Sequence, residues 1–323
     1  MNLKKISNPI QDDLKSFSKH FNREMRSRVG IVDTVARYIA RQKGKKIRPI
    51  LVFLSAHLTG TVNERTYRAA TLVEILHTAT LVHDDVVDQS DTRRGFPSIN
   101  RIWKNKVAVL MGDYFLARGL LIALEQDEFY FLKIISDAVK RMSEGELLQI
   151  QKSKTYDITE DTYFQIISGK TASLIGTCCE LGAASVTEDR EQWQQLRDFG
   201  ENLGMAFQIR DDLLDYIGRS TITGKPTGLD MKEKKFTLPL IYALKNSDRK
   251  SNRQIIRIIK NGASRKEIDY VIDFVDNKGG LEYATKKAGE YAERALEGIE
   301  SYPESTAKDA IRELVKFAIE RTK

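Results

Sequence analysis

The chain has 323 residues, of which 41% are hydrophobic and 30% are charged. This is the composition of an ordinary folded globular protein and excludes a disordered or fibrous chain. The net charge is +7, but the basic residues are spread along the chain and do not form the dense run, interleaved with aromatics, that nucleic-acid binding requires. No uninterrupted apolar run approaches the roughly 18 residues that cross a bilayer, and the polar N-terminus is unlike a secretory signal. We therefore expect a cytoplasmic protein without a transmembrane segment that binds small anionic ligands.

Helices are predicted wherever apolar residues recur at three- and four-residue steps, as they do in 67–87, 193–216 and 281–299. Proline is absent from 98–225, which permits long helices there. Loops are predicted at 44–49, 90–98, 218–228 and 245–252, where Gly, Pro and polar residues gather. Strand-like alternation is hard to find, so we predict an all-α fold with one domain over 1–323. Cys178 and Cys179 are adjacent and are expected to be small buried residues beside glycines, without a disulfide or a metal.

The first acidic cluster, LVHDDVVDQSD, contains Asp84, Asp85 and Asp88. On a helix, Asp84 and Asp88 lie about 40° apart, whereas Asp85 points about 100° away from Asp84. Two carboxylates about 6 Å apart repel by roughly 2 to 3 kcal/mol at an effective dielectric near 20, so a shared cation is expected. A solvated acidic helix end is the ordinary alternative. The apolar residues upstream instead place these acids at the rim of a buried segment.

A second cluster, QIRDDLLDY, repeats the pattern with Asp211, Asp212 and Asp215. Asp211 and Asp215 are predicted to share one face, with Asp212 pointing elsewhere. Carboxylate oxygens suit Mg²⁺, which takes one or two carboxylates together with phosphate oxygens and water. Two such clusters in one chain favour a site for a metal and a diphosphate.

Basic residues lie in two predicted loops near these acids. Arg93 and Arg94 follow the first cluster, and Lys45 and Arg48 stand in the 44–49 loop. A single Lys or Arg in a loop is most often a solvated surface charge. Together with two acidic clusters, they become candidates for binding phosphate oxygens. His77 lies about 20° off the helical face of Asp84 and should point into the same cavity.

At these residues the chain resembles the trans-prenyltransferases that make polyprenyl diphosphates. Six stretches carry the resemblance, in order: GKKIRP, LVHDDVVDQSDTRRG, GDYFLARG, SGKTASL, QIRDDLLDY and GKPTGLDMKEKKFTLPL. The resemblance implies a large helical bundle of the isoprenoid synthase type, with the two acidic clusters facing each other across a central cavity. The chain departs from the family where Lys43-Gly44-Lys45 replaces Gly-Gly-Lys and where Glu233-Lys234-Lys235 replaces Glu-Gly-Lys. Each loop thereby loses a glycine that would permit unusual backbone angles.

The resemblance also implies a role for each matching residue. The diphosphate of isopentenyl diphosphate would be held by Lys45, Arg48, His77 and Arg94. The allylic diphosphate would be held by Arg93, Lys170, Thr171, Gln208, Lys225 and Lys235. Mg²⁺, about three ions per site with substrate bound, would be held by Asp84, Asp88 and Asp211. The residues expected to take part in catalysis are Asp84, Asp88, Asp211, Asp215, Lys170 and Lys225.

The reaction implied is the condensation of isopentenyl diphosphate onto an allylic diphosphate primer, after ionisation of the allylic carbon-oxygen bond. Ala79 and Thr80, five and four residues before Asp84, are small. In the family, aromatic residues there accompany short products, so we expect an all-trans product of about seven to ten isoprene units, with octaprenyl favoured. Such a product should partition into a membrane and could serve as a quinone side chain. The resemblance further implies a homodimer.

Several alternatives stay open from the sequence. A short-chain geranylgeranyl or farnesyl diphosphate synthase differs only in its product. A non-catalytic subunit of a heteromeric prenyl synthase would be expected to lose part of an acidic cluster or the Arg pair, and both are intact. A helical di-metal oxidase would need two Glu-x-x-His pairs, of which only Glu74 to His77 is found. A terpene cyclase would leave Lys45, Arg48 and Arg94 without a second diphosphate.

Overall fold

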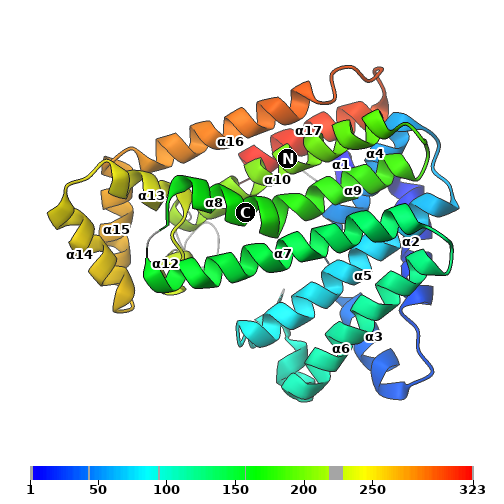
Figure 1. Cartoon of the computed structure of the whole chain (residues 1–323), viewed down its shortest axis with the longest axis horizontal. Coiled ribbons are helices and arrows are strands. Elements are labelled where there is room, and N and C mark those ends of the chain that lie inside the picture. Colours follow the sequence, from blue (N-terminus) through cyan, green and yellow to red (C-terminus); the bar gives the residue numbers. More distant parts are fainter. Residues whose placement is uncertain (1–2, 43, 94, 157, 218–227, 322–323) are drawn as a thin grey trace.

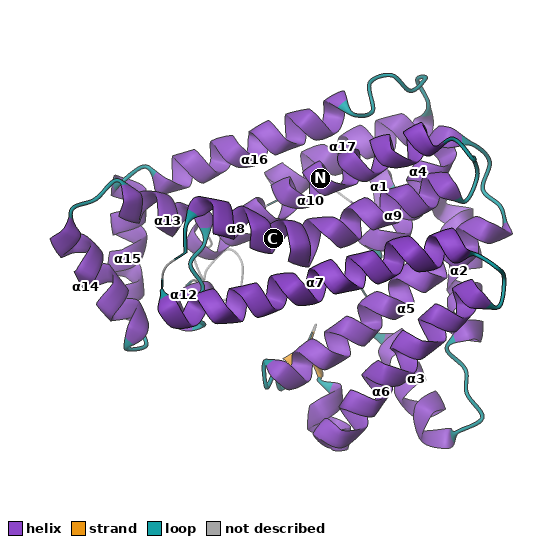
Figure 2. Cartoon of the chain, viewed as in Figure 1, coloured by secondary structure: helices purple, strands orange, loops and turns teal. Residues whose placement is uncertain are grey.

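Helices make up nearly all of the regular structure (Figures 1 and 2). The computed structural model describes residues 3–42, 44–93, 95–156, 158–217 and 228–321. The elements of the first half are α1 (Leu3–Ile6), η1 (Asn8–Ile10), α2 (Gln11–Glu24), α3 (Gly30–Arg41), α4 (Ile47–Thr59), α5 (Glu64–Val87), β1 (Thr92–Arg93), β2 (Phe96–Pro97), α6 (Ile99–Leu124) and α7 (Phe129–Thr155). Those of the second half are α8 (Glu160–Ile167), η2 (Ser168–Ala172), α9 (Ser173–Ala184), α10 (Arg190–Ile217), α12 (Leu229–Lys232), α13 (Leu238–Lys245), α14 (Arg249–Lys260), α15 (Arg265–Asn277), α16 (Gly280–Glu297) and α17 (Thr306–Glu320).

The all-α prediction is confirmed, and the three predicted helices correspond to α5, α10 and α16. The start of α5 is fixed by Asn63, whose side chain accepts hydrogen bonds from the backbone N–H groups of Arg65 and Thr66. In return, the Thr66 hydroxyl accepts from the Asn63 N–H, which completes a capping box. The proline-free region holds the long helices α6, α7 and α10, as predicted.

Three loop predictions are wrong in part. In 44–49, α4 already begins at Ile47, because a proline is tolerated in the first helical turn, where its missing N–H would have no partner. In 245–252, only 246–248 connect α13 to α14, since Asp248 caps α14 through the N–H groups of Lys250 and Ser251. In 90–98, the chain forms a two-stranded antiparallel hairpin, β1 with β2.

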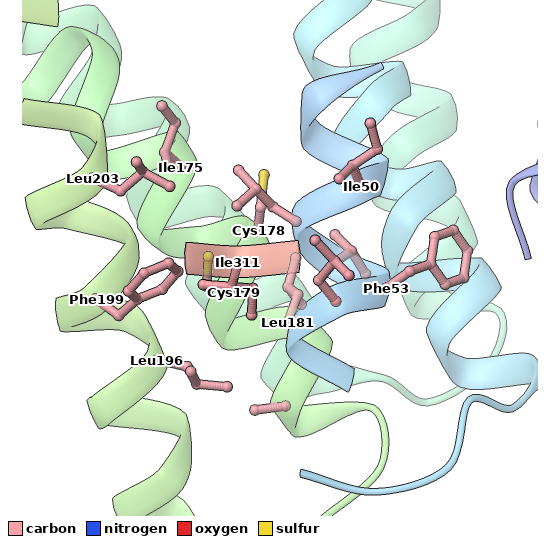
Figure 3. Close-up of a cluster of buried hydrophobic side chains, with 14 of the residues drawn as sticks. Ile50, Phe53, Ile175, Cys178, Cys179, Leu181, Leu196, Phe199, Leu203 and Ile311 are labelled. Carbon is pink, nitrogen blue, oxygen red and sulfur yellow. The ribbon is translucent and has the colours of Figure 1, made fainter. Parts of the chain in front are cut away.

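The main hydrophobic core lies where α9 packs between α4 and α10 (Figure 3). Cys178 and Cys179 are free and buried there, as predicted. Two glycines allow the helices to approach closely: a Cβ on Gly182 would lie 2.4 Å from the Val52 carbonyl oxygen, and one on Gly200 would lie 2.7 Å from the Cα of Gly176. Larger side chains would separate these helices.

Two further hydrophobic clusters flank the main core. One joins the C-terminal half of α10 to α13, α14, α15 and α16; of these, α13, α14 and α15 gather at one end of the molecule (Figure 1). The other joins α3, α5 and α6. The helix Ile99–Leu124 is long and apolar enough to cross a membrane by length and composition, with 39% of its most apolar window buried. The sequence prediction considered only uninterrupted apolar runs and therefore did not identify this helix.

Candidate functional site

The first acidic cluster lies at the C-terminal end of α5, and its three carboxylates have different surroundings. Asp85 is buried and accepts a hydrogen bond from Nε of Arg93 at 2.6 Å. Asp84 is half-buried and Asp88, which ends the helix, is exposed. Burial raises the pKa of Asp84, the carboxylate of Glu146 raises it further, and Lys170 opposes both effects. Asp85 is therefore engaged by Arg93, while Asp84 and Asp88 stay candidates for binding a metal.

The second cluster, near the end of α10, differs from the prediction. Asp211 is more than half exposed, but Asp215 accepts hydrogen bonds at 3.0 Å from the backbone N–H groups of Leu229 and Asp230 and so fixes the start of α12. Asp212, expected to point elsewhere, lines a cavity beside Asp211. Helical spacing predicted which acids share a face, but it could not predict that α12 would cover the Asp215 face.

Lys170 reaches the first cluster from η2, a single π-helical turn between α8 and α9. Its Nζ lies 2.5 Å from a carboxylate oxygen of Glu146 on α7 and 3.5 Å from the side-chain oxygen of Gln149. This placement depends on close backbone contact, because a Cβ on Gly145 would lie 2.9 Å from the Lys170 backbone nitrogen. The π-turn therefore rests directly on α7 and directs Lys170 toward Asp84.

Lys235 connects the two clusters electrostatically. Burial alone would lower its pKa, but Glu233 at 2.5 Å, Asp230 and then Asp88 raise the pKa above the ordinary value. Lys234, which stands where the family has glycine, adopts a left-handed backbone with φ of 59°. The chain therefore keeps the backbone shape of a glycine turn without the glycine.

The cavity beside the second cluster is lined by polar side chains from five helical segments. Gln208 donates to Asp212 at 2.8 Å, and the Thr171 hydroxyl donates to Gln208 at 2.8 Å. The Tyr163 hydroxyl also donates to Asp212, at 2.6 Å. Burial raises the pKa of Asp230, and the carboxylates of Asp212 and Asp215 raise it further. The lining includes Gln149, Tyr163, Lys170, Thr171, Gln208, Asp211, Asp212, Asp230 and Lys235.

A second cavity lies between α2, α3 and the C-terminal half of α5. Its polar lining includes Lys46, His77, Asp85 and Arg93, and its apolar lining includes Phe17. His77 therefore shares a cavity with Asp85 and Arg93, whereas its helical angle predicted that it would share one with Asp84. On α5, His77 lies near the face of Asp84, and the helices that pack against α5 determine which cavity its side chain enters.

The remaining predicted basic residues are not all in these two linings. Lys45 is exposed, and its Nζ lies 5.9 Å from the centre of the Phe317 ring on α17. Arg48 is half-buried in the first turn of α4. Arg94 and Lys225 lie outside the described residues. Arg93 lies against Asp85, with its guanidinium partly exposed.

The C-terminal end of the described chain meets the second cluster. A guanidinium nitrogen of Arg321 lies 2.8 Å from an Asp211 carboxylate oxygen and 3.1 Å from the Phe207 carbonyl oxygen. The Arg321 guanidinium also stacks 3.8 Å from the centre of the Phe207 ring. Because α17 also carries Phe317 beside Lys45, this helix brings the 44–49 region close to the second acidic cluster.

The two residues predicted to set chain length lie on different sides of α5. Ala79 is buried in the cluster that includes Met111 and Phe115 of α6. Thr80 is half-buried, and its hydroxyl donates to the His77 carbonyl oxygen at 2.9 Å. A bulky side chain at position 79 would therefore press on α6.

Five residues of the site were not predicted from the sequence: Glu146, Gln149, Tyr163, Asp230 and Arg321. Glu146 and Gln149 had a signal, because they lie three residues apart, beside a glycine, in the proline-free stretch that permits long helices. Asp230 had a weaker one, as an acid directly after Gly228-Leu229. Tyr163 and Arg321 are buried, and nothing in the sequence pattern marks them as part of a site.

The donor set of the site fits a hard divalent cation shared with a phosphate. The acids offer only oxygen atoms, and they lie on two helices, α5 and α10, with Lys170 and Lys235 between them. Within the described residues, no three His, Cys, Asp or Glu side chains converge closely enough to hold a metal alone. Such an arrangement matches Mg²⁺, which completes its coordination with phosphate oxygens and water.

Comparison with known proteins identifies the family. The sequence profile described as Polyprenyl synthetase matches residues 29–275. The chain is 40% identical to an all-trans-nonaprenyl-diphosphate synthase (geranyl-diphosphate specific) from Rhodobacter capsulatus, over 97% of this chain and 96% of that protein. The crystal structure of a decaprenyl diphosphate synthase from the same organism superposes with a TM-score of 0.93, at 32% identity and over the whole of both chains. A polyprenyl synthase from Caulobacter crescentus, crystallised with calcium and isoprenyl diphosphate, superposes with a TM-score of 0.91 at 32% identity, over 100% of this chain and 98% of that one. The resemblance drawn from six sequence stretches is thus confirmed, and the chain belongs to the polyprenyl synthetase family of prenyltransferases.

Proposed function

We propose that this chain condenses isopentenyl diphosphate units onto an allylic diphosphate and releases a long all-trans polyprenyl diphosphate. The observation that carries the proposal is that Lys170 and Lys235 line the same cavity as Asp211. The charge of Lys170 also opposes the rise in the pKa of Asp84, and the charge of Asp88 contributes to the raised pKa of Lys235. Two acidic clusters with cations between them are suited to a metal-bound diphosphate. The relatives named for long products support the same activity.

We assign the residues as follows. Asp84, Asp88 and Asp211 would hold the divalent metal, for which we propose about three Mg²⁺ ions, and the metal would stabilise negative charge on the departing diphosphate. Lys170, Thr171, Gln208, Lys235 and Lys225 hold the allylic diphosphate, together with Arg93. Lys45, Arg48, His77 and Arg94 hold the diphosphate of isopentenyl diphosphate. Asp215 has a structural role: it holds the start of α12 and thereby positions Asp230 and Lys235.

The covalent step begins when the allylic carbon-oxygen bond breaks and its electron pair leaves with the diphosphate. The double bond of isopentenyl diphosphate then attacks the allylic cation, which forms the new carbon-carbon bond. The resulting cation loses a proton to the released diphosphate, so no protein nucleophile is required. The side chains that hold the leaving group in place are Lys170 and Lys235, because fixed cations need no reorganisation as charge develops.

We propose a product of about seven to ten isoprene units, because short products in the family go with aromatic residues where this chain has Ala79 and Thr80. Leu72, Val73 and Leu76 line the buried continuation of α5, and Met142 of α7 packs against the same core. These side chains are the candidates for the end of the product cavity. A short-chain synthase is the alternative, and the length of the product distinguishes the two.

We also propose that two copies of this chain pair through α6 and α7 and that 1–323 form one domain. Leu110, Leu121 and Leu124 lie within about 60° of one another on α6 and are 57%, 44% and 49% exposed. Leu147, on α7, is 66% exposed. An apolar stripe of this kind on two adjacent helices fits a second copy of the same surface.

A cytoplasmic location, expected from the sequence, stays a prediction.

The test of the proposed activity is incubation of the purified chain with isopentenyl diphosphate and an allylic primer. With Mg²⁺, we expect isopentenyl units to be incorporated into extractable polyprenyl diphosphate. After chelation by EDTA, incorporation should stop and should return when Mg²⁺ is restored in excess. Failure with geranyl, farnesyl and geranylgeranyl diphosphate alike would overturn the proposal.

A further inference from the structure

Helix α14 carries an unusual concentration of positive charge. Its twelve residues, RKSNRQIIRIIK, contain five cations and no acid. Relative to the buried Ile255, these five side chains fall within an arc of about 100°, centred on the side opposite Ile255 and Ile259. All five are exposed, and the stripe runs the length of the helix, about 18 Å. They are Arg249, Lys250, Arg253, Arg257 and Lys260.

The carboxylates of the protein do not neutralise this stripe. Among the described residues, Arg249, Lys250, Arg253 and Arg257 have no carboxylate oxygen within 4.0 Å. Lys260 lies 4.4 Å from the centre of the Tyr156 ring, which leaves its charge uncompensated. By contrast, Arg312 of α17 has its charge balanced by contacts with Glu300 and Glu304. The field of α14 is therefore directed to solvent.

The position of α14 makes this face accessible and links it to the site. Its buried isoleucines belong to the same hydrophobic cluster as Ile209 and Leu213, which flank Asp211 on α10. The helix lies at the end of the molecule that also holds α12 (Figure 1). The basic face is thus held rigidly at the end of the molecule where the second acidic cluster lies.

We propose that the cationic face of α14 docks this enzyme on an anionic phospholipid surface. The choice of partner rests on the proposed function: a product with some forty carbons is far too apolar to be released into water and has to enter a bilayer. Each basic residue near an anionic membrane raises the binding constant about fivefold, so five suffice for reversible attachment. Because Ile255 and Ile259 are buried in the protein, attachment is electrostatic and inserts no apolar side chain. A nucleic acid is disfavoured because α14 has no aromatic residue for stacking on bases.

The test is co-sedimentation of the full chain, without substrate, with two kinds of vesicle. We expect binding to vesicles that contain phosphatidylglycerol, no binding to pure phosphatidylcholine, and loss of binding as salt shortens the Debye length. The double variant Arg253→Glu/Arg257→Glu should bind at least about twentyfold more weakly. The matched control, Lys286→Glu/Lys316→Glu, changes the net charge equally at exposed sites on α16 and α17 and should bind within about twofold of wild type.

Two results would overturn the docking proposal. One is wild-type protein that stays in solution when mixed with phosphatidylglycerol vesicles. If such protein binds poly-glutamate instead, the partner of α14 is an acidic protein and the docking proposal is equally overturned. The other is equal binding by the two double variants. Condensation activity is measured separately: a chain that makes polyprenyl diphosphate but ignores vesicles refutes only the docking, whereas one that binds vesicles but makes no product refutes the proposed function.

Discussion

Individual carboxylates in the two clusters perform different tasks despite their identical spacing. Asp85 pairs with Arg93, and Asp215 holds the start of α12. Asp84, Asp88 and Asp211 are the acids that we propose as metal ligands, and one oxygen of Asp211 also contacts Arg321. Asp212 is held between Tyr163 and Gln208. At the residue scale, then, the neighbouring side chain decides what each acid does.

Replacing Asp84 or Asp211 by Ala should lower condensation about thousandfold or more, because each removes a metal ligand worth several kcal/mol in the transition state. Stability should change little, since neither side chain is fully buried. Steady-state kinetics with saturating Mg²⁺ would measure the loss. Asp198→Ala, at an exposed position on α10, is the control and should keep full activity. Normal turnover in both active-site variants would contradict the two-cluster mechanism.

Lys234 carries a cost in backbone conformation. A left-handed residue other than glycine costs about 1 to 2 kcal/mol, and glycine loses about 0.5 to 1 kcal/mol more in conformational entropy on folding. Lys234→Gly should therefore raise the free energy of unfolding by about 0.5 to 1 kcal/mol, as measured by urea denaturation. Lys232→Gly, in the last turn of α12, should lower it. A decrease in both variants would show that the Lys234 side chain contributes more than the backbone strain removes.

At the scale of elements, the site depends on how closely backbones approach. The π-turn η2 lies against α7 at Gly145 and Gly169, where an added Cβ on Gly169 would come within 2.8 Å of the Arg141 carbonyl oxygen. Because these contacts are to backbone atoms, no side-chain movement can relieve them. The two glycines therefore set how closely η2, which carries Lys170, approaches α7.

Gly145→Ala should displace η2 and with it Lys170, since the new methyl group would lie 2.9 Å from the Lys170 backbone nitrogen. We expect kcat/KM for the allylic primer to fall about tenfold or more. Gly289→Ala on α16 is the matched control, because no atom lies within 4 Å of its added Cβ. This control should keep its activity and gain up to about 1 kcal/mol from helix propensity. Equal activity of the two variants would rule out the positioning role of Gly145.

At the scale of the whole molecule, the sequence predicted more of the chemistry than of the geometry. Apolar periodicity located α5, α10 and α16, and the paired acidic clusters identified a diphosphate site. Three contacts could not be predicted. The start of α12 packs on Asp215, His77 lines the cavity that holds Asp85 and Arg93, and Arg321 binds Asp211. Each depends on contacts between elements that are distant in sequence, which no local pattern encodes.

The apolar stripe on α6 and α7 predicts assembly into a dimer. Leu110→Glu/Leu121→Glu places two charges in the stripe and should yield a monomer, as measured by sedimentation velocity. Val29→Glu, at an equally exposed site before α3, should leave the dimer intact. A monomeric wild type, or a double variant that remains dimeric, would contradict the assignment of this surface.

The most direct test of the proposed function is the length of the product made by the wild-type chain from isopentenyl diphosphate, a primer and Mg²⁺. We predict a product series that ends at about seven to ten isoprene units. Ala79→Tyr introduces the kind of aromatic residue that accompanies short products in the family, and should end the series at roughly fifteen or twenty carbons, whereas Ala79→Ser should not shorten it. A wild-type series ending at fifteen or twenty carbons, or no condensation at all, would contradict the assignment as a long-chain polyprenyl diphosphate synthase.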